Sequence, residues 1–260
     1  MSLAYMPDVA VEGIIGAGKT TLLDRLRSDF RSGAQQPFCE PVDEPVTSYQ
    51  AYNILEENYK DPKKNAFVAQ THILNVLYLH HQCVQYLSKE SDLPILTERS
   101  FFSPLAFIST YFEMGYISET EHHVLKTLWH RLFWPKTSTF SVPKKIFFLD
   151  VPPEVCLERI RIRNRPGEST ITLEFLQCLR KNYRQLLLKY ALHHGCPVVW
   201  MFHNKTFIPE LTQYFQRTFP RGRRERRMGW FRRSVCRLAG FLGRAIPVME
   251  GFCFQVLALI

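Results

Sequence analysis

The sequence predicts an α/β fold, in which a five-stranded parallel sheet carries helices on both faces and a lid. Short apolar runs alternate with helix-patterned segments, which is the element order of a parallel sheet. A hydrophobic content of 46% in 260 residues is enough to bury a sizeable core. Strands are expected over residues 9–11, 37–39, 93–97, 145–151 and 197–202. Helices are expected over residues 19–30, 48–59, 63–88, 103–115, 119–133, 153–164, 172–194 and 206–217.

A phosphate-binding loop joins the first strand to the first helix. Residues 13–20 read Gly-Ile-Ile-Gly-Ala-Gly-Lys-Thr and match G-x-x-x-x-G-K-[ST] in full. The backbone N–H groups of such a loop converge on phosphate oxygens, and the helix that follows adds the positive end of its dipole. We expect Lys19 to reach the β- and γ-phosphates of ATP and the Thr20 hydroxyl to bind Mg²⁺. The predicted ATP-binding residues here are Gly13, Ile14, Ile15, Gly16, Ala17, Gly18, Lys19, Thr20 and Thr21.

Charged residues follow the second and third predicted strands. Glu40 comes directly after the second strand, and Glu98 and Arg99 come directly after the third. Ligands of a doubly wound sheet gather at the carboxyl ends of its strands. In phosphoryl transfer one carboxylate can take the proton of the attacking hydroxyl, another can hold Mg²⁺, and an arginine can offset charge on the transferred group. We therefore expect these three side chains near Lys19.

Arginines follow the fourth predicted strand, where two prolines end the strand and open the helix over 153–164. Arg159 and Arg163 are four residues apart and would share one helix face. Arg165 then begins a loop. This arrangement predicts a lid that closes arginines over the triphosphate and excludes water during transfer. A solvated basic helix face is the alternative interpretation.

Positive charge is concentrated after the fifth strand and its helix. The net charge is +9, and residues 221–260 contribute +7 of it, from nine arginines and two glutamates. The main domain, residues 1–220, therefore carries only +2 and is not expected to bind nucleic acid. The extension over 221–260 interleaves arginine with apolar residues, which suits a membrane surface or a nuclear import patch. An extension without any partner is the other interpretation.

The cysteines and the amino terminus bear on the compartment. The seven cysteines are scattered and form no C-x-x-C pair, which excludes a simple disulfide framework or zinc site and suits a reducing environment. Too few residues precede the first strand for a signal or transit peptide. We expect a cytoplasmic protein, with the nucleus as the alternative.

Taken together, these motifs resemble those of the deoxynucleoside kinases over about residues 8–215. The stretches that carry the resemblance are residues 11–20, 40–42, 67–71, 98–100 and 159–175. The resemblance implies a P-loop kinase fold, ATP as phosphoryl donor with Mg²⁺, and transfer to the 5′-hydroxyl of a deoxynucleoside. It also implies a homodimer, since members of the family commonly pair.

The resemblance assigns roles to individual residues. It implies that Glu40 is the base that accepts the 5′-hydroxyl proton, that Glu98 assists Mg²⁺, and that Arg99 holds the 5′ end and the phosphoryl group. Tyr59 and Glu168 would bind the sugar 3′-hydroxyl. Gln70 would pair with the base, because an amide offers a donor and an acceptor side by side. Arg159, Arg163 and Arg165 would be the lid arginines.

The acceptor is inferred from departures from the family pattern. Members that prefer cytosine or purines place an Arg and an Asp where this chain has Leu77 and Pro104. An apolar wall leaves room for the 5-methyl group of thymine, so we expect thymidine to be accepted, with deoxycytidine as a further candidate. Leu55 is a further candidate for substrate binding. The Trp expected five residues after Glu40 is Pro45, and the Phe expected before Gln70 is Ala69. Packing on the base must then come from elsewhere, and the candidates are Phe67, Phe101, Phe107 and Ile108.

Two other functions stay open on the residues alone. A thymidylate kinase also combines a phosphate loop with lid arginines, although it would show an acidic residue in the loop and D-R in place of Glu98-Arg99. A kinase-like subunit of respiratory complex I shares the fold and would be a non-catalytic interaction module. The complete set of charged candidates favours chemistry over the second alternative.

Overall fold

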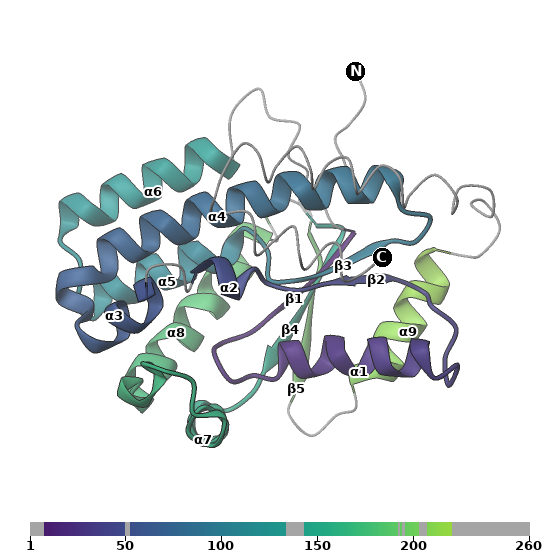
Figure 1. Ribbon diagram of the computed structural model, residues 1–260. Helices are drawn as coiled ribbons and strands as arrows, with labels where there is room; N and C mark the ends of the chain where they lie inside the picture. Colours follow the sequence, from purple (N-terminus) through teal and green to yellow (C-terminus); the bar gives the residue numbers. More distant parts are fainter. Residues whose placement is uncertain are drawn as a thin grey trace.

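The computed structural model describes residues 8–49, 53–133, 143–191, 193, 196–202 and 207–219, so the predicted extension over 221–260 lies outside the described residues. Five parallel strands form one sheet in the order β2-β3-β1-β4-β5 (Figure 1). The strands are β1 (Val9–Glu12), β2 (Glu40–Val42), β3 (Ile95–Glu98), β4 (Lys145–Asp150) and β5 (Val198–Phe202). The predicted five-stranded parallel α/β fold is confirmed.

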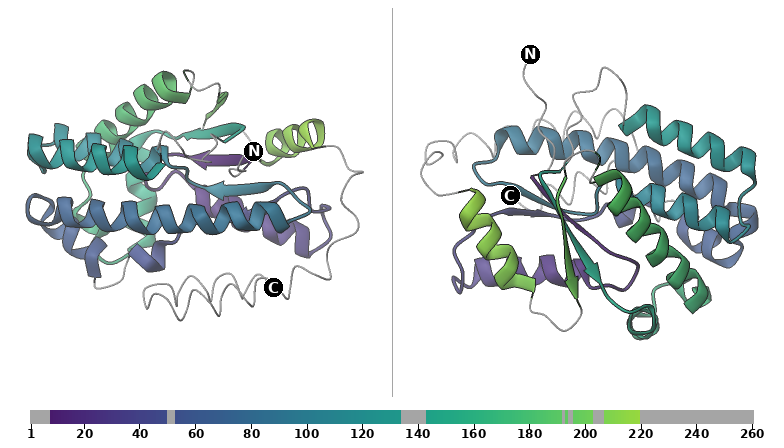
Figure 2. Two further views of the ribbon diagram at one scale, coloured as in Figure 1. Left: turned by 90° about the horizontal axis from the view of Figure 1, so that it is seen from above. Right: turned by 180° about the vertical axis from the view of Figure 1, so that it is seen from behind.

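Helices cover both faces of this sheet. Figures 1 and 2 show α4 along one face and α1 with α9 along the other. The helices are α1 (Lys19–Arg31), α2 (Val46–Tyr49), α3 (Ile54–Lys60), α4 (Pro62–Glu90), α5 (Phe102–Glu113), α6 (Glu119–Phe133), α7 (Pro153–Arg163), α8 (Leu173–Leu186) and α9 (Phe207–Thr218). A 3₁₀ turn (Glu168–Thr170) joins α7 to α8, and a π-helical stretch (Leu187–Ala191) follows α8. No described helix combines the length and apolar character needed to cross a membrane.

The central strands are apolar because both of their faces are covered. Val9, Ala10 and Val11 of β1 are fully buried, as expected for a parallel strand between two layers of helices. β1 pairs with β3 on one side and with β4 on the other. The carboxyl ends of β1 and β3 therefore lie side by side, and the phosphate loop and the segment after Glu98 leave the sheet at the same edge.

The second strand differs from its prediction. It covers 40–42 rather than 37–39, and the predicted helix over 48–59 is divided into α2 and α3. Glu40 pairs with Ile95 and Val42 with Thr97. β2 is one of the two edge strands of this sheet, where a proline such as Pro41 is tolerated because one side of the strand needs no partner.

Candidate active site

A cavity of about 980 Å³ opens at the carboxyl edge of the sheet. The phosphate loop, α3, α4, α5, the segment between α7 and α8, and the start of α9 all contribute to its wall. The predicted site residues that line it are Ile15, Gly16, Ala17, Gly18, Lys19, Thr20, Thr21, Leu55, Tyr59, Gln70, Leu77, Glu98, Arg99, Pro104, Arg159, Arg163, Arg165 and Glu168. Four predicted residues lie outside this lining: Gly13, Ile14, Glu40 and Ile108.

Lys19 is held against the start of its own loop. Its Nζ donates to the carbonyl oxygens of Gly13 at 3.1 Å and Ile14 at 3.2 Å, which gives these two residues a supporting position behind the lining. Burial, followed by repulsion from Arg99, lowers the pKa of Lys19 from 10.5 to about 8. A phosphate beside the ammonium group would favour its charged form again, because an opposite charge stabilises it.

Thr20 and Glu98 lie together at the start of α1. The Thr20 hydroxyl is 3.1 Å and 3.0 Å from the two carboxylate oxygens of Glu98. Burial raises the pKa of Glu98, and the positive charge of Lys19 acts in the opposite direction. A hydroxyl and a carboxylate at this spacing fit Mg²⁺, which takes one or two protein oxygens and completes its shell with phosphates and water.

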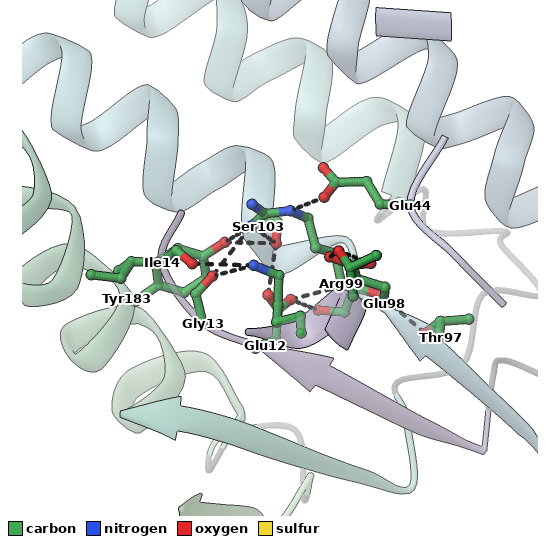
Figure 3. Close-up of polar contacts among 12 residues, drawn as sticks. Glu12, Gly13, Ile14, Glu44, Thr97, Glu98, Arg99, Ser103 and Tyr183 are labelled. Carbon is green, nitrogen blue, oxygen red and sulfur yellow. Dashed lines mark hydrogen bonds and ion pairs between the residues drawn. The ribbon is translucent and has the colours of Figure 1, made fainter. Parts of the chain in front are cut away.

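Arg99 occupies the centre of a buried polar network (Figure 3). Its backbone lies in the left-handed region, with φ of 68°, and its N–H donates to the carbonyl of Val11 at 2.8 Å. Nε donates to Glu44 at 2.5 Å, and Nη1 donates to the Tyr183 hydroxyl at 2.6 Å. The guanidinium also lies over the ring of Phe107, 5.3 Å from its centroid. The Arg99 side chain is therefore fixed before any ligand binds.

A second carboxylate supports Arg99 from behind. Glu12 is fully buried and accepts hydrogen bonds from the N–H and hydroxyl of Ser100 at 2.8 and 2.6 Å, and from the hydroxyl of Ser103 at 2.7 Å. Ser103 in turn lies 2.7 Å from the Tyr183 hydroxyl and 3.3 Å from Nη1 of Arg99. Burial raises the pKa of Glu12, and the nearby Arg99 charge acts in the opposite direction.

The position predicted for Glu40 is wrong. Glu40 is the first residue of β2 and pairs with Ile95, three residues before the end of β3. It therefore lies within the sheet, away from the carboxyl edge at which ligands bind. Burial raises its pKa, and the positive charge of Arg27 of α1 acts in the opposite direction.

Glu44 stands where Glu40 was expected. The stretch Glu-Pro-Val occurs twice, at 40–42 and at 44–46, and only the second copy follows β2. Glu44 lines the cavity and pairs with Arg99. Counted from Glu44, the aromatic residue that appeared to be missing is Tyr49, which lines the cavity as well. Spacing along the sequence could not distinguish the two copies, because both are compatible with a neighbouring strand end.

The base of the predicted lid is tied to the phosphate loop. Nη1 of Arg159 donates to the carbonyl oxygens of Gly16 at 3.4 Å and Ala17 at 3.2 Å. A β-carbon at Gly16, whose φ is 78°, would lie 2.5 Å from the carbonyl oxygen of Cys156 in α7. Only glycine fits there, because the loop backbone packs directly on the helix backbone.

The tip of the predicted lid brings charged side chains to the cavity. Nε and Nη2 of Arg163 donate to the carboxylate of Glu168 at 2.8–3.1 Å, and Arg165 lies 3.5 Å from the same carboxylate. Only 3% of the Glu168 side chain is exposed. The Thr170 hydroxyl donates to the carbonyl of Tyr59 at 2.7 Å, which docks this segment on α3. Tyr59 and Glu168 thus both line the cavity.

α4 and α5 add apolar residues to the wall of the cavity. Leu77 of α4 and Pro104 of α5 both line it. Gln70 is 2% exposed, and its Oε1 has no hydrogen-bond partner among the described residues. Of the candidates for packing on the base, Phe107 lines the cavity. The position predicted for Ile108 is wrong, because Ile108 is fully buried in the core, as Phe101 is.

Further lining residues were missed by the sequence prediction. They are Val46, Tyr49, Asn58, Ile73, Ser103, Tyr111 and residues 207–209, together with Leu22, Arg25 and Asp29 of α1. Positions 104, 107 and 111 recur at the spacing of one helix face, so this periodicity could have indicated Tyr111. The sequence carries no comparable signal for residues 207–209.

Comparison with known proteins assigns the family. Residues 9–216 match the sequence pattern of the family described as Deoxynucleoside kinase. The chain belongs to the deoxynucleoside kinase family. Membership supports phosphorylation of nucleosides with an ATP-type donor. The match covers the phosphate loop, the Glu44–Arg99 pair and the arginine-rich segment.

Similar proteins of this family differ in their named substrates. A Dictyostelium discoideum deoxyadenosine kinase is 30% identical over 179 residues, 69% of this chain and 66% of that protein. The mitochondrial thymidine kinase 2 of Macaca fascicularis is 26% identical over 212 residues, 80% of this chain and 74% of that protein. The solved structure of M. mycoides deoxyadenosine kinase with bound dCTP has a TM-score of 0.61 at 20% identity, covering 80% of this chain and 97% of that one. The last likeness concerns the fold.

Proposed function

We propose that this deoxynucleoside kinase transfers a phosphoryl group from ATP to the 5′-hydroxyl of a deoxynucleoside, with thymidine as an acceptor. The observation that carries the proposal is that the Glu44–Arg99 pair and Lys19 of the phosphate loop line the same cavity. A phosphoryl donor and an alcohol can then meet there with a base and a positive charge already in position.

The donor side follows from the phosphate loop. Backbone N–H groups of the loop and the start of α1 suit the phosphates, and Lys19 would neutralise the β- and γ-phosphates. Thr20 and Glu98 would hold Mg²⁺, which offsets charge on the phosphates when it is bound. Arg159 and Arg163 supply further positive charge from the lid side of the cavity.

The acceptor side assigns the base to Glu44. A carboxylate within reach of the 5′-hydroxyl can take its proton as the oxygen attacks phosphorus. The hydrogen bond from Nε of Arg99 keeps Glu44 oriented, and the same guanidinium would offset the charge that develops on the transferred group.

The remaining lining residues would orient the nucleoside. Tyr59 and Glu168 are suited to the sugar 3′-hydroxyl, and Gln70 can pair with one edge of the base. Leu77 and Pro104 offer an apolar surface to the 5-methyl group of thymine, which supports thymidine as an acceptor.

A substrate panel tests the proposal. ATP–Mg²⁺ is incubated with thymidine, deoxycytidine, deoxyadenosine, deoxyguanosine and thymidine monophosphate, and each product is quantified. We expect thymidine 5′-monophosphate as a main product. Preference for deoxyadenosine would contradict the acceptor assignment. Turnover of thymidine monophosphate alone would identify a thymidylate kinase, and tight ATP binding without any transfer would identify a non-catalytic protein.

A further inference from the structure

Asn58 of α3 presents an unsatisfied acceptor to the cavity. Its side chain is buried, with 1% of the residue exposed, and it lines the cavity. Nδ2 donates to the hydroxyl of Tyr111 at 2.7 Å. Among the described residues, Oδ1 has no hydrogen-bond partner. A buried acceptor left unpaired is costly, so its presence in a cavity wall indicates a ligand that supplies the missing donor.

The position of Asn58 along the cavity follows from the two helices that flank it. Tyr111 near the end of α5 bonds Asn58 of α3, and α4 begins four residues after Asn58, so the end of α5 lies near the start of α4 and the two helices run in opposite directions (Figure 1). Ser103 near the start of α5 lies 3.3 Å from Nη1 of Arg99, and Tyr111 follows Ser103 by eight residues, about 12 Å of helix. Tyr111 and its partner Asn58 therefore lie away from Arg99, on the side of the cavity where α4 begins, and Gln70 belongs to the first third of α4.

Gln70 and Asn58 together define a hydrogen-bonding pattern. Oε1 of Gln70 and Oδ1 of Asn58 are both buried acceptors without partners among the described residues, and the Gln70 amide also carries donors. The Watson–Crick edge of cytosine matches this pattern, because its amino group has two N–H donors and N3 is an acceptor. Thymine has one N–H donor there, at N3, which Gln70 alone satisfies together with O4.

We propose that Asn58 is a specificity-determining residue, whose carbonyl oxygen accepts a hydrogen bond from the exocyclic amino group of cytosine. This inference rests on the proposed nucleoside kinase function and extends it, because it makes deoxycytidine an acceptor beside thymidine. Gln70 takes one amino hydrogen and Asn58 takes the other. The hydrogen bond from Nδ2 to Tyr111 holds the amide with its oxygen toward the base.

Two variants separate the carbonyl oxygen of Asn58 from its role in the helix contact. Asn58→Leu removes both the acceptor and the bond to Tyr111, whereas Tyr111→Phe removes the same bond and keeps the acceptor. For each variant, kcat/KM is measured with deoxycytidine and with thymidine. We expect Asn58→Leu to lower kcat/KM for deoxycytidine about tenfold while thymidine changes about twofold or less, as loss of one substrate hydrogen bond implies. Tyr111→Phe should lower the ratio less than Asn58→Leu does, because the carbonyl oxygen remains although the hydrogen bond that orients it is lost.

A substrate analogue tests the same inference on the wild-type protein, so this test does not depend on whether a variant folds. N4-methyldeoxycytidine retains one amino hydrogen and should be about tenfold poorer than deoxycytidine, because only one of the two acceptors can then be satisfied. An unchanged deoxycytidine-to-thymidine ratio in Asn58→Leu, or equal ratios in both variants, overturns the inference. If Asn58→Leu lowers kcat/KM for deoxyadenosine rather than for deoxycytidine, the inference is overturned as well. Absence of turnover with every nucleoside overturns the proposed function instead.

Discussion

Glu44 accepts a hydrogen bond from Nε of Arg99 at 2.5 Å inside the cavity that also holds Lys19. We expect Glu44→Gln to lower kcat by about 10² to 10⁴, the usual contribution of a general base. Binding of ATP should be retained, because the phosphate loop is unchanged. Glu40→Gln is the matched control, since it alters the same motif four residues earlier, and it should stay within about twofold of wild type. Loss of turnover in Glu40→Gln alone would reverse the assignment.

Glu12 should act on turnover through Arg99. In Glu12→Gln the amide can no longer accept all three hydrogen bonds from Ser100 and Ser103. Ser103, which contacts Nη1 of Arg99, is then held less firmly, so the guanidinium is less well positioned. We expect kcat to fall about tenfold while KM for ATP changes little, since a displaced arginine stabilises the transferred group less. Steady-state kinetics of purified protein measures both constants.

Asp8 provides the control for Glu12 at the opposite end of β1. It is also buried, and it accepts hydrogen bonds from Ile95 and from Lys144 at 3.2 and 2.6 Å. Asp8→Asn should lower the free energy of unfolding by about 1–3 kcal/mol, as expected for a disturbed buried carboxylate, and leave kcat unchanged. Equal losses of kcat in both variants would mean that Glu12 acts only through stability.

The docking of the lid segment on α3 depends on Gly167. Its φ is 81°, and a β-carbon there would lie 2.9 Å from Cα of Glu56. We expect Gly167→Ala to push this segment off α3, raising KM for the nucleoside about tenfold or more, because Glu168 would lose its place beside Tyr59. Gly115→Ala is the control, since Gly115 has a φ of 67° but no atom of the described residues lies within 4 Å of an added β-carbon. Equal kinetic effects would show backbone strain rather than the Glu56 contact.

Two buried histidines predict an acid-sensitive fold. Burial lowers the pKa of His80 from 6.5 to about 3 and that of His81 to about 4. Between about pH 6.5 and 4 these two imidazoles are protonated in the unfolded chain and neutral in the folded chain. The free energy of unfolding therefore falls as the pH falls, by up to about 2.7 kcal/mol per pH unit for two protons. Chemical denaturation at several pH values measures this slope.

The contribution of one histidine is isolated by difference. Buried carboxyls with a raised pKa, such as Glu12, act in the opposite sense, so the slope of a variant is compared with that of wild type. His81→Leu should reduce the slope by about 1.4 kcal/mol per pH unit, the value for one proton. His130→Gln alters an exposed side chain and should leave the slope unchanged. Parallel slopes in His81→Leu and wild type would contradict the prediction.

The sequence predicted the central sheet well because its strands are continuous apolar runs. β1 and β4 lie within a residue of their predicted bounds, and the phosphate loop follows β1 as expected. The edge strand β2 was misplaced because it contains Glu40 and Pro41, residues that strand patterns disfavour. Only its pairing with β3 shows that the strand begins at Glu40, and this pairing is a long-range property that local patterns do not contain.

The same limit explains the errors in the candidate site. Where one copy of a motif exists, as for Lys19 and Arg99, the motif residues at the strand ends line the cavity. Glu40 and Glu44 belong to two copies of one tripeptide, and the position of the strand end decides between them. Ile108 and Phe107 are adjacent, so a helix rotation of about 100° decides which one faces the cavity. Asn58 was missed because the feature that distinguishes it is a side-chain oxygen without a hydrogen-bond partner among the described residues, and a sequence does not show which atoms are paired.

The contact of Gly16 with Cys156 limits where this protein can bend. Because the phosphate loop lies on the backbone of α7, and Arg159 is bonded to the loop, the first two turns of α7 form one rigid unit with the loop. Any opening of the arginine-bearing segment must therefore hinge beyond these turns, at Asn164 and Gly167, which have left-handed backbones. Substrate entry would then move Glu168 and Arg165 outward, while the phosphate loop and Arg159 stay in place.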